Sequence, residues 1–86
     1  MERLKQLRHK INEVDEQILQ SLKKRVEISK SIGLVKKKKG IAIQDVPREN
    51  DVFTHVRKKA LDLGLNPAYV EAIYWQIVHL CSEVQN

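Results

Sequence analysis

The stretch that decides the fold is Glu2–Lys37, which reads ERLKQLRHKINEVDEQILQSLKKRVEISKSIGLVKK. Alternate steps of three and four residues follow an apolar seam made of Leu4, Leu7, Ile11, Val14, Ile18, Ser21, Arg25, Ile28, Ile32 and Val35. Eight of these ten positions are aliphatic, and neither Gly nor Pro occurs in this stretch before Gly33. This period predicts one long amphipathic helix from about Glu2 to Lys37 or slightly beyond, with Gly40 as its stop.

Arg25 interrupts the middle of this seam. A cation in an apolar seam must lose its water, which is costly unless an anion meets it. The seam contains neither Asp nor Glu, so the anion must come from elsewhere in the fold, from a partner or from a ligand. The alternative is that the guanidinium head of Arg25 reaches past its neighbours into solvent.

The length of the predicted helix bears on assembly. About 34 helical residues span roughly 50 Å, whereas a compact domain of 86 residues is about 30 Å across. Two shorter helices cannot cover the whole seam of such a rod. We therefore expect a second copy to lie alongside it in an intertwined helical homodimer.

Two shorter helices are predicted after Gly40. Asp45 is a candidate N-cap with Pro47 in the first turn, and this helix runs to about Leu63. Its apolar residues are Val52, Phe53, Val56, Ala60 and Leu63. Asn66 is a candidate N-cap of the last helix, which has Pro67 in its first turn and runs almost to residue 86. This helix presents Val70, Ile73, Tyr74, Ile77, Cys81 and Val84 on one face. The prediction is an all-α single domain over residues 1–86 with three helices.

Composition excludes several function classes. Sixteen Lys and Arg against eleven Asp and Glu give a net charge of +5, which favours an anionic partner without identifying it. A single cysteine and three scattered histidines argue against a disulfide or a structural zinc site. Sparse aromatic residues, none within the basic run, argue against nucleic-acid binding by base stacking. Without an apolar stretch of 18 residues or a signal-peptide pattern, we expect a cytoplasmic protein with no membrane contact.

Helical spacing groups several polar residues. Lys36 is 11 residues beyond Arg25, close to three turns, so both project from nearly the same face. Arg8 is 17 residues before Arg25, about 25 Å away along the helix, so it cannot reach a small ligand at Arg25 from its own chain. In an antiparallel or crossed dimer, Arg8 of the partner subunit could reach that ligand. Taken alone, Arg8 and Lys36 are also explained as solvated flanking charges.

A second group combines the start of the middle helix with the end of the last one. Arg48 and Glu49 lie three and four residues after Asp45, and Gln85 lies four residues after Cys81, so each set can share a helix face. Helix capping and surface ion pairing explain the first set without any function. For Gln85 the alternative without a function is that it lies in a frayed last turn and contacts nothing.

These positions resemble the all-α class of chorismate mutases, found in small archaeal enzymes and in the N-terminal domains of bacterial bifunctional ones. The resemblance covers nearly the whole chain, through LRHKINEVDEQIL (7–19), KKRVEISKSIGLVK (23–36), IQDVPREND (43–51) and AYVEAIYWQIVHLCSEVQ (68–85). Its specific part is an ordered set of polar residues: Arg8, Arg25, Lys36, Asp45, Arg48, Glu49 and Gln85.

The resemblance implies a role for each residue of that set. Arg8 of one chain and Arg25 of the other would clamp the two substrate carboxylates. Lys36 would bond a carboxylate and the ether oxygen, and Gln85, where other members have Glu, would be the second donor to that oxygen. Asp45, through its backbone, and Glu49 would hold the ring hydroxyl. Arg48 would line the site and provide electrostatic support.

The implied reaction is the Claisen rearrangement of chorismate to prephenate, in phenylalanine and tyrosine biosynthesis. A pericyclic step needs no nucleophile, cofactor or metal, and the substrate dicarboxylate supplies the anion that Arg25 lacks. Cys81 stands where a relative has a serine that bonds a carboxylate. Because a thiol is a weak donor, Cys81 is a candidate binding residue or only a lining one.

Three other functions compete with this one. An isochorismate–pyruvate lyase has the same fold, but the lyases lack the acidic pair that Asp45 and Glu49 form here. A non-catalytic dimeric module that binds nucleic acid would need a continuous basic face, whereas the lysines here gather at one helix end. The third alternative is a catalytically silent regulatory dimer with the same fold.

Overall fold

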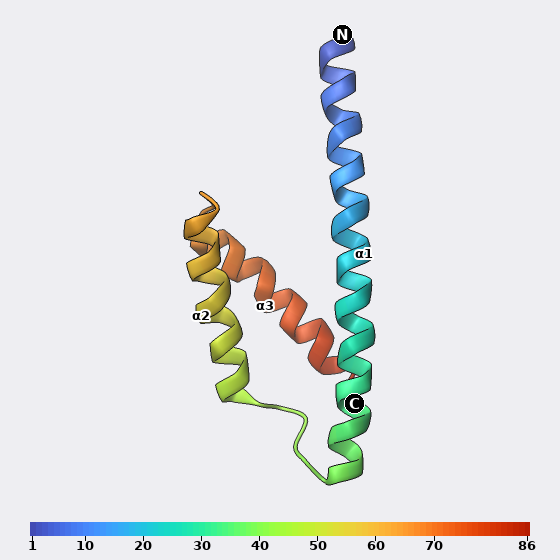
Figure 1. The fold of residues 1–86 in the computed structure, drawn as a ribbon, viewed down its shortest axis with the longest axis vertical. Coiled ribbons are helices and arrows are strands. Elements are labelled where there is room, and N and C mark those ends of the chain that lie inside the picture. The colour runs from blue at the N-terminus through green and yellow to red at the C-terminus, as the bar shows by residue number, and fades with distance from the viewer.

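A computed structural model describes residues 1–86, and its three elements are all helices. Helix α1 spans Glu2–Lys39, α2 spans Val46–Asp62 and α3 spans Pro67–Glu83 (Figure 1). The predicted all-α fold with a long first helix is confirmed, and each end lies within about two residues of the expected one. No helix is both long enough and apolar enough to span a membrane.

The helix ends follow from local sequence. Gly40 takes the left-handed conformation, with φ of 67°, and its N–H bonds to the carbonyls of the last turn of α1. Asp45 caps α2, because its carboxylate accepts a 3.0 Å hydrogen bond from the backbone N–H of Arg48. Asn66 caps α3 in the same way through the N–H of Ala68, also at 3.0 Å. The predicted caps at Gly40, Asp45 and Asn66 are therefore confirmed.

The helices pack in a chain rather than as a bundle. Helix α2 packs along α3, and the C-terminal part of α3 packs on α1, whereas no Cα atom of α1 lies within 8 Å of one in α2. The buried apolar residues lie on α2 and α3: Phe53, Val56, Ala60, Val78 and Cys81. An ion pair of 2.6 Å between Arg57 and Glu71 also joins α2 to α3. As Figure 1 shows, α3 crosses the space between the other two helices.

Two expected core residues are not in this core. Leu63 and Ile73 are 62% and 60% exposed, and Val78, which lies outside the predicted face of α3, is buried instead. The physical reason is that α3 has two packing partners on different sides, α2 and α1, so a single apolar stripe does not describe its buried surface. Trp75 stacks on Phe53 with ring centroids 4.8 Å apart, although Trp75 is 57% exposed.

Helix α1 extends well beyond its packing partners. The chain measures 57 Å along its longest axis and has a radius of gyration of 16.3 Å, against about 12 Å for a compact domain of this length. The N-terminal part of α1 runs past α2 and α3 in Figure 1. All eight aliphatic residues of the seam are 39–61% exposed. A monomer therefore leaves this apolar seam open to water.

Candidate active site

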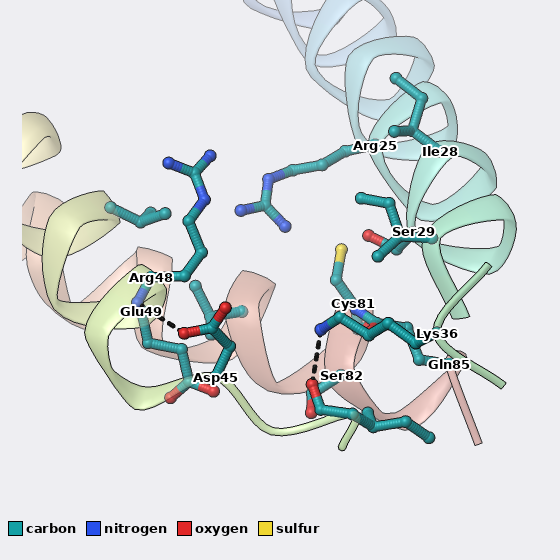
Figure 2. A pocket seen from close by; sticks show the side chains of 14 residues that line it. Arg25, Ile28, Ser29, Lys36, Asp45, Arg48, Glu49, Cys81, Ser82 and Gln85 are labelled. Carbon is teal, nitrogen blue, oxygen red and sulfur yellow. Dashed lines mark hydrogen bonds between the residues drawn. The ribbon is translucent and has the colours of Figure 1, made fainter. Parts of the chain in front are cut away.

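A cavity of about 420 Å³ lies between α1 and α2, with the C-terminal part of α3 completing its wall (Figure 2). Its size is in the range of small-molecule sites. Fourteen residues line it: Arg25, Ile28, Ser29, Ile32, Lys36, Ile43, Asp45, Arg48, Glu49, Val52, Val78, Cys81, Ser82 and Gln85.

Helix α1 supplies one wall through residues at helical spacing. Arg25, Ser29 and Lys36 follow each other at four and seven residues, so they share one face of the helix. The Lys36 ammonium donates a 2.7 Å hydrogen bond to the backbone oxygen of Ile43, in the segment that joins α1 to α2. An ammonium has three donors, so this bond leaves two for a ligand.

The first turn of α2 supplies the opposite wall. The Asp45 carboxylate accepts from the N–H of Arg48, so it serves as the helix cap. The guanidinium groups of Arg48 and Arg25 project from opposite walls toward the same space (Figure 2). The ion pairs of the structure lie elsewhere, at His9–Glu13, Lys23–Glu27, Arg57–Glu71 and His79–Glu83.

Helix α3 contributes Cys81 and Gln85. Cys81 is buried, with 3% exposure. Gln85 follows the end of α3 and is half-buried, and its Nε2 donates to the carbonyl of Cys81 at 3.2 Å. Its Oε1 is buried and accepts no hydrogen bond within the chain. The same residue lies against the backbone of Gly33 on α1, so here Gln85 is a packed part of the wall.

The structure brings together seven of the eight residues proposed for the site from sequence. These are Arg25, Lys36, Asp45, Arg48, Glu49, Cys81 and Gln85. The eighth, Arg8, is exposed on the N-terminal part of α1 and lies outside this cavity. This agrees with the expectation that Arg8 cannot serve the site of its own chain.

Ser29 is the main residue that sequence analysis missed. It is the one polar residue of the buried set, at 6% exposure, and its hydroxyl makes no hydrogen bond within the chain. The available signal was its position four residues after Arg25 and seven before Lys36, on the face that carries both cations. Several apolar lining residues and Ser82 were likewise not singled out as site residues.

The charges of the cavity favour a small anion with more than one negative group. Three cations, Arg25, Lys36 and Arg48, face it without an ion pair to any carboxylate of the chain. Glu49 stands at the start of α2, next to the Asp45 cap. Arginine binds carboxylates with a planar pair of donors, and lysine acts as a point charge. The arrangement suits binding of a dicarboxylate and stabilisation of charge on an oxygen.

Comparisons with known proteins relate the chain to chorismate mutases. The family model described as "Chorismate mutase type II" matches residues 7–86. The chain is 34% identical, over 98% of its length, to the bifunctional chorismate mutase/prephenate dehydratase of Aquifex aeolicus, of which it covers 22%. It is 34% identical over 67% of its length to the chorismate mutase of Methanocaldococcus jannaschii, of which it covers 59%. The chain thus spans about a fifth to three fifths of the length of these relatives.

A solved structure supports the same relationship. A conserved hypothetical protein from Pyrococcus furiosus superposes with a TM-score of 0.77 at 34% sequence identity, over 96% of this chain and 95% of that one. Both the long first helix and the two shorter ones therefore have a counterpart in a known fold. With the family match over residues 7–86, these findings show that the chain belongs to the type II chorismate mutase family.

Proposed function

We propose that this chain is a chorismate mutase, which converts chorismate to prephenate. The observation that carries the proposal is the cavity of about 420 Å³ into which three cations project without carboxylate partners. Chorismate carries two carboxylates, so it supplies the anions that these cations lack. Membership in the family makes this substrate the first to test.

The reaction breaks a C–O bond of the substrate while a C–C bond forms. It proceeds within one molecule, so the protein has two tasks. The first is to hold the enolpyruvyl side chain over the ring in the reactive conformer, which removes an entropic part of the barrier. The second is to stabilise the negative charge that develops on the ether oxygen.

Each task has candidate residues in the cavity. Arg25 and one donor of Lys36 bind carboxylates, and Lys36 also donates to the ether oxygen. Gln85 is the second donor to that oxygen, because a carboxamide has two N–H groups and Cys81 engages one of them. The ring hydroxyl is held by Glu49 and the backbone of Asp45, and Arg48 supplies positive potential across the site.

We propose in addition that two copies of this single domain form an intertwined dimer with two shared sites. The eight exposed aliphatic residues of the α1 seam support this arrangement, since water contact with such a surface is unfavourable. Arg8 of the partner subunit then completes the carboxylate clamp opposite Arg25. Arg8 lies about 25 Å from Arg25 along α1, so this arrangement gives it a role in the site of the partner subunit.

The experiment that tests the activity is direct. Purified protein is mixed with chorismate, the loss of chorismate is followed in the ultraviolet, and the product is converted by acid to phenylpyruvate. Enzyme-dependent formation of phenylpyruvate after acid treatment supports the mutase. Release of pyruvate from isochorismate, with no prephenate formed from chorismate, would overturn the proposal in favour of the lyase. Inertness toward both substrates would favour a regulatory or binding dimer.

A further inference from the structure

We propose that Gly33 is a positioning residue: its missing β-carbon lets the turn that carries Gln85 dock on α1. This inference rests on the proposed function and deepens it, because it states how one of the two donors to the ether oxygen reaches its place. Gly33 does not touch the substrate in this proposal. It acts through Gln85.

The contact between the two residues is closer than any β-carbon allows. A β-carbon built on Gly33 would stand 2.7 Å from the Cα of Gln85, 2.8 Å from its backbone oxygen and 3.0 Å from its Cβ. Two of these three atoms belong to the backbone of Gln85. A change of side-chain rotamer therefore cannot relieve the overlap, so a larger residue at position 33 must move the turn that carries Gln85 away from α1.

Glycine is not needed at this position for its conformational freedom. The glycines with positive φ are Gly40 and Gly64, whereas Gly33 is in the interior of α1 with ordinary helical geometry. A glycine in a helix interior costs about 0.5–1 kcal/mol relative to alanine. Local helix stability thus favours alanine at position 33, and the close approach of Gln85 is the feature that opposes it.

The position of the Gln85 carboxamide depends on this docking. Gln85 lies beyond the end of α3, where its N–H donates to the carbonyl of Ser82 at 3.2 Å. Its side chain is held by the carbonyl of Cys81 and is half-buried. Because these bonds tie Gln85 to the last turn of α3, the separation of that turn from α1 sets how far the carboxamide stands from the Lys36 ammonium.

The positions of both donors to the ether oxygen, Lys36 and Gln85, therefore depend on one turn of α1. Lys36 lies three residues after Gly33 on the same helix, so the helix backbone carries one donor directly. The other donor is placed by contact with Gly33. A displacement of about 1 Å at position 85 leaves Lys36 unmoved and separates the two donors, which a reacting oxygen must meet together.

The test compares Gly33→Ala with wild type in the full chain. We expect kcat to fall by about tenfold or more, in keeping with the cost of misplacing a catalytic group, and KM to change by less than about threefold because carboxylate binding is retained. Helix content by circular dichroism should be equal or higher. Ser31→Ala, on an exposed site two residues earlier in α1, is the matched control and should retain wild-type kcat.

A double-mutant cycle separates positioning from a general structural effect. In a Gln85→Ala background the carboxamide is already absent, so adding Gly33→Ala should lower kcat by less than about twofold. A loss in the double variant equal to the product of the two single losses would overturn the proposal. That result would mean that Gly33→Ala damages the site by a route independent of Gln85.

A measurement on the wild-type protein tests the contact without any variant. The Hα protons of Gly33 and Gln85 should show a nuclear Overhauser effect, and its absence would overturn the inference even if Gly33→Ala failed to fold. If the effect is present and the protein does not turn over chorismate, the docking stands as a structural contact and the proposed function fails. The two failures are therefore distinguishable.

Discussion

The ammonium group of Lys36 donates a 2.7 Å hydrogen bond to the backbone oxygen of Ile43. This bond joins the end of α1 to the segment that leads into α2, and it holds the ammonium at the cavity while the other two donors stay free. Lys36 thus links the two walls of the site. A substitution of Lys36 should affect the chemistry and, to a smaller extent, the attachment of the segment that joins α1 to α2.

Replacing Lys36 by Ala should lower turnover by about 10²-fold or more, because it removes a charged donor aimed at the developing charge. The fall in kcat should exceed the rise in KM, since the contact with the ether oxygen strengthens in the transition state. Steady-state kinetics with chorismate checks this, with thermal unfolding as the control for the lost Ile43 bond. A folded Lys36→Ala variant with wild-type kcat would remove Lys36 from the mechanism.

Replacing Arg25 by Ala should reduce kcat/KM by about 10²-fold or more, because a charge-assisted bond to a carboxylate is lost in a desolvated site. The same variant should keep or raise its unfolding temperature, since Arg25 pairs with no carboxylate of the chain. Arg57→Ala is the matched control. It loses the ion pair with Glu71, so it should lower stability by at most about 1 kcal/mol with near-normal activity. Loss of stability in Arg25→Ala, with activity retained, would indicate a structural role instead.

The shared site predicts complementation between inactive variants. Arg8→Ala and Arg25→Ala dimers, mixed under conditions that allow subunit exchange, should form heterodimers with one intact site each. Activity should therefore recover from both near-silent preparations. Proven exchange without recovery would refute sharing, and light scattering that shows a folded 10.0 kDa chain would refute the dimer itself.

Ser29 should contribute to binding, because it lines the cavity on the face of α1 that carries both Arg25 and Lys36. Ser29→Ala removes a neutral hydrogen bond, which is worth about 0.5–1.5 kcal/mol, so KM should rise between about two- and tenfold. Ser31→Ala is the matched control, since that hydroxyl is exposed and bonds the carbonyl of Glu27 at 3.4 Å. Equal kinetics for the two variants would show that Ser29 only fills space.

Gln85→Glu should make turnover depend on pH. A protonated carboxyl can donate to the ether oxygen, whereas the ionised form repels the charge that develops there. Burial of the Oε1 position and the facing Cys81 carbonyl both disfavour ionisation, so the introduced carboxyl should titrate above its reference pKa of about 4.3. Turnover of the variant should therefore be highest in acid and fall as pH rises through the pKa of the introduced carboxyl.

The wild-type protein is the comparison. Its carboxamide does not titrate, so wild-type turnover should stay level from about pH 5 to 8 within the stability range of the protein. Identical profiles would show that Gln85 does not contact the reacting oxygen.

The helices and their ends could be predicted from sequence because their causes are local. The seam of α1, the left-handed Gly40 and the caps at Asp45 and Asn66 all depend on residues within about four positions of each other. The shared face of Arg25 and Lys36 follows from the helical repeat alone. The resemblance to a family then brought Asp45, Arg48, Glu49 and Gln85 to the same site.

Tertiary structure decided the features that depend on how far one helix stands from another. Gly33 and Gln85 are 52 positions apart in the sequence, yet they approach so closely that a β-carbon on Gly33 would stand 2.7 Å from the Cα of Gln85. No helical repeat anticipates this contact. Ser29 becomes a site residue only because α3 and α2 enclose the face on which it lies. The exposure of Ile73 has the same origin, since the side of α3 that is buried depends on two packing partners. Sequence by itself determined the helices and the chemistry available on each face, whereas packing determined which groups meet, because contacts between distant segments arise from side-chain shape rather than from local hydrogen bonding.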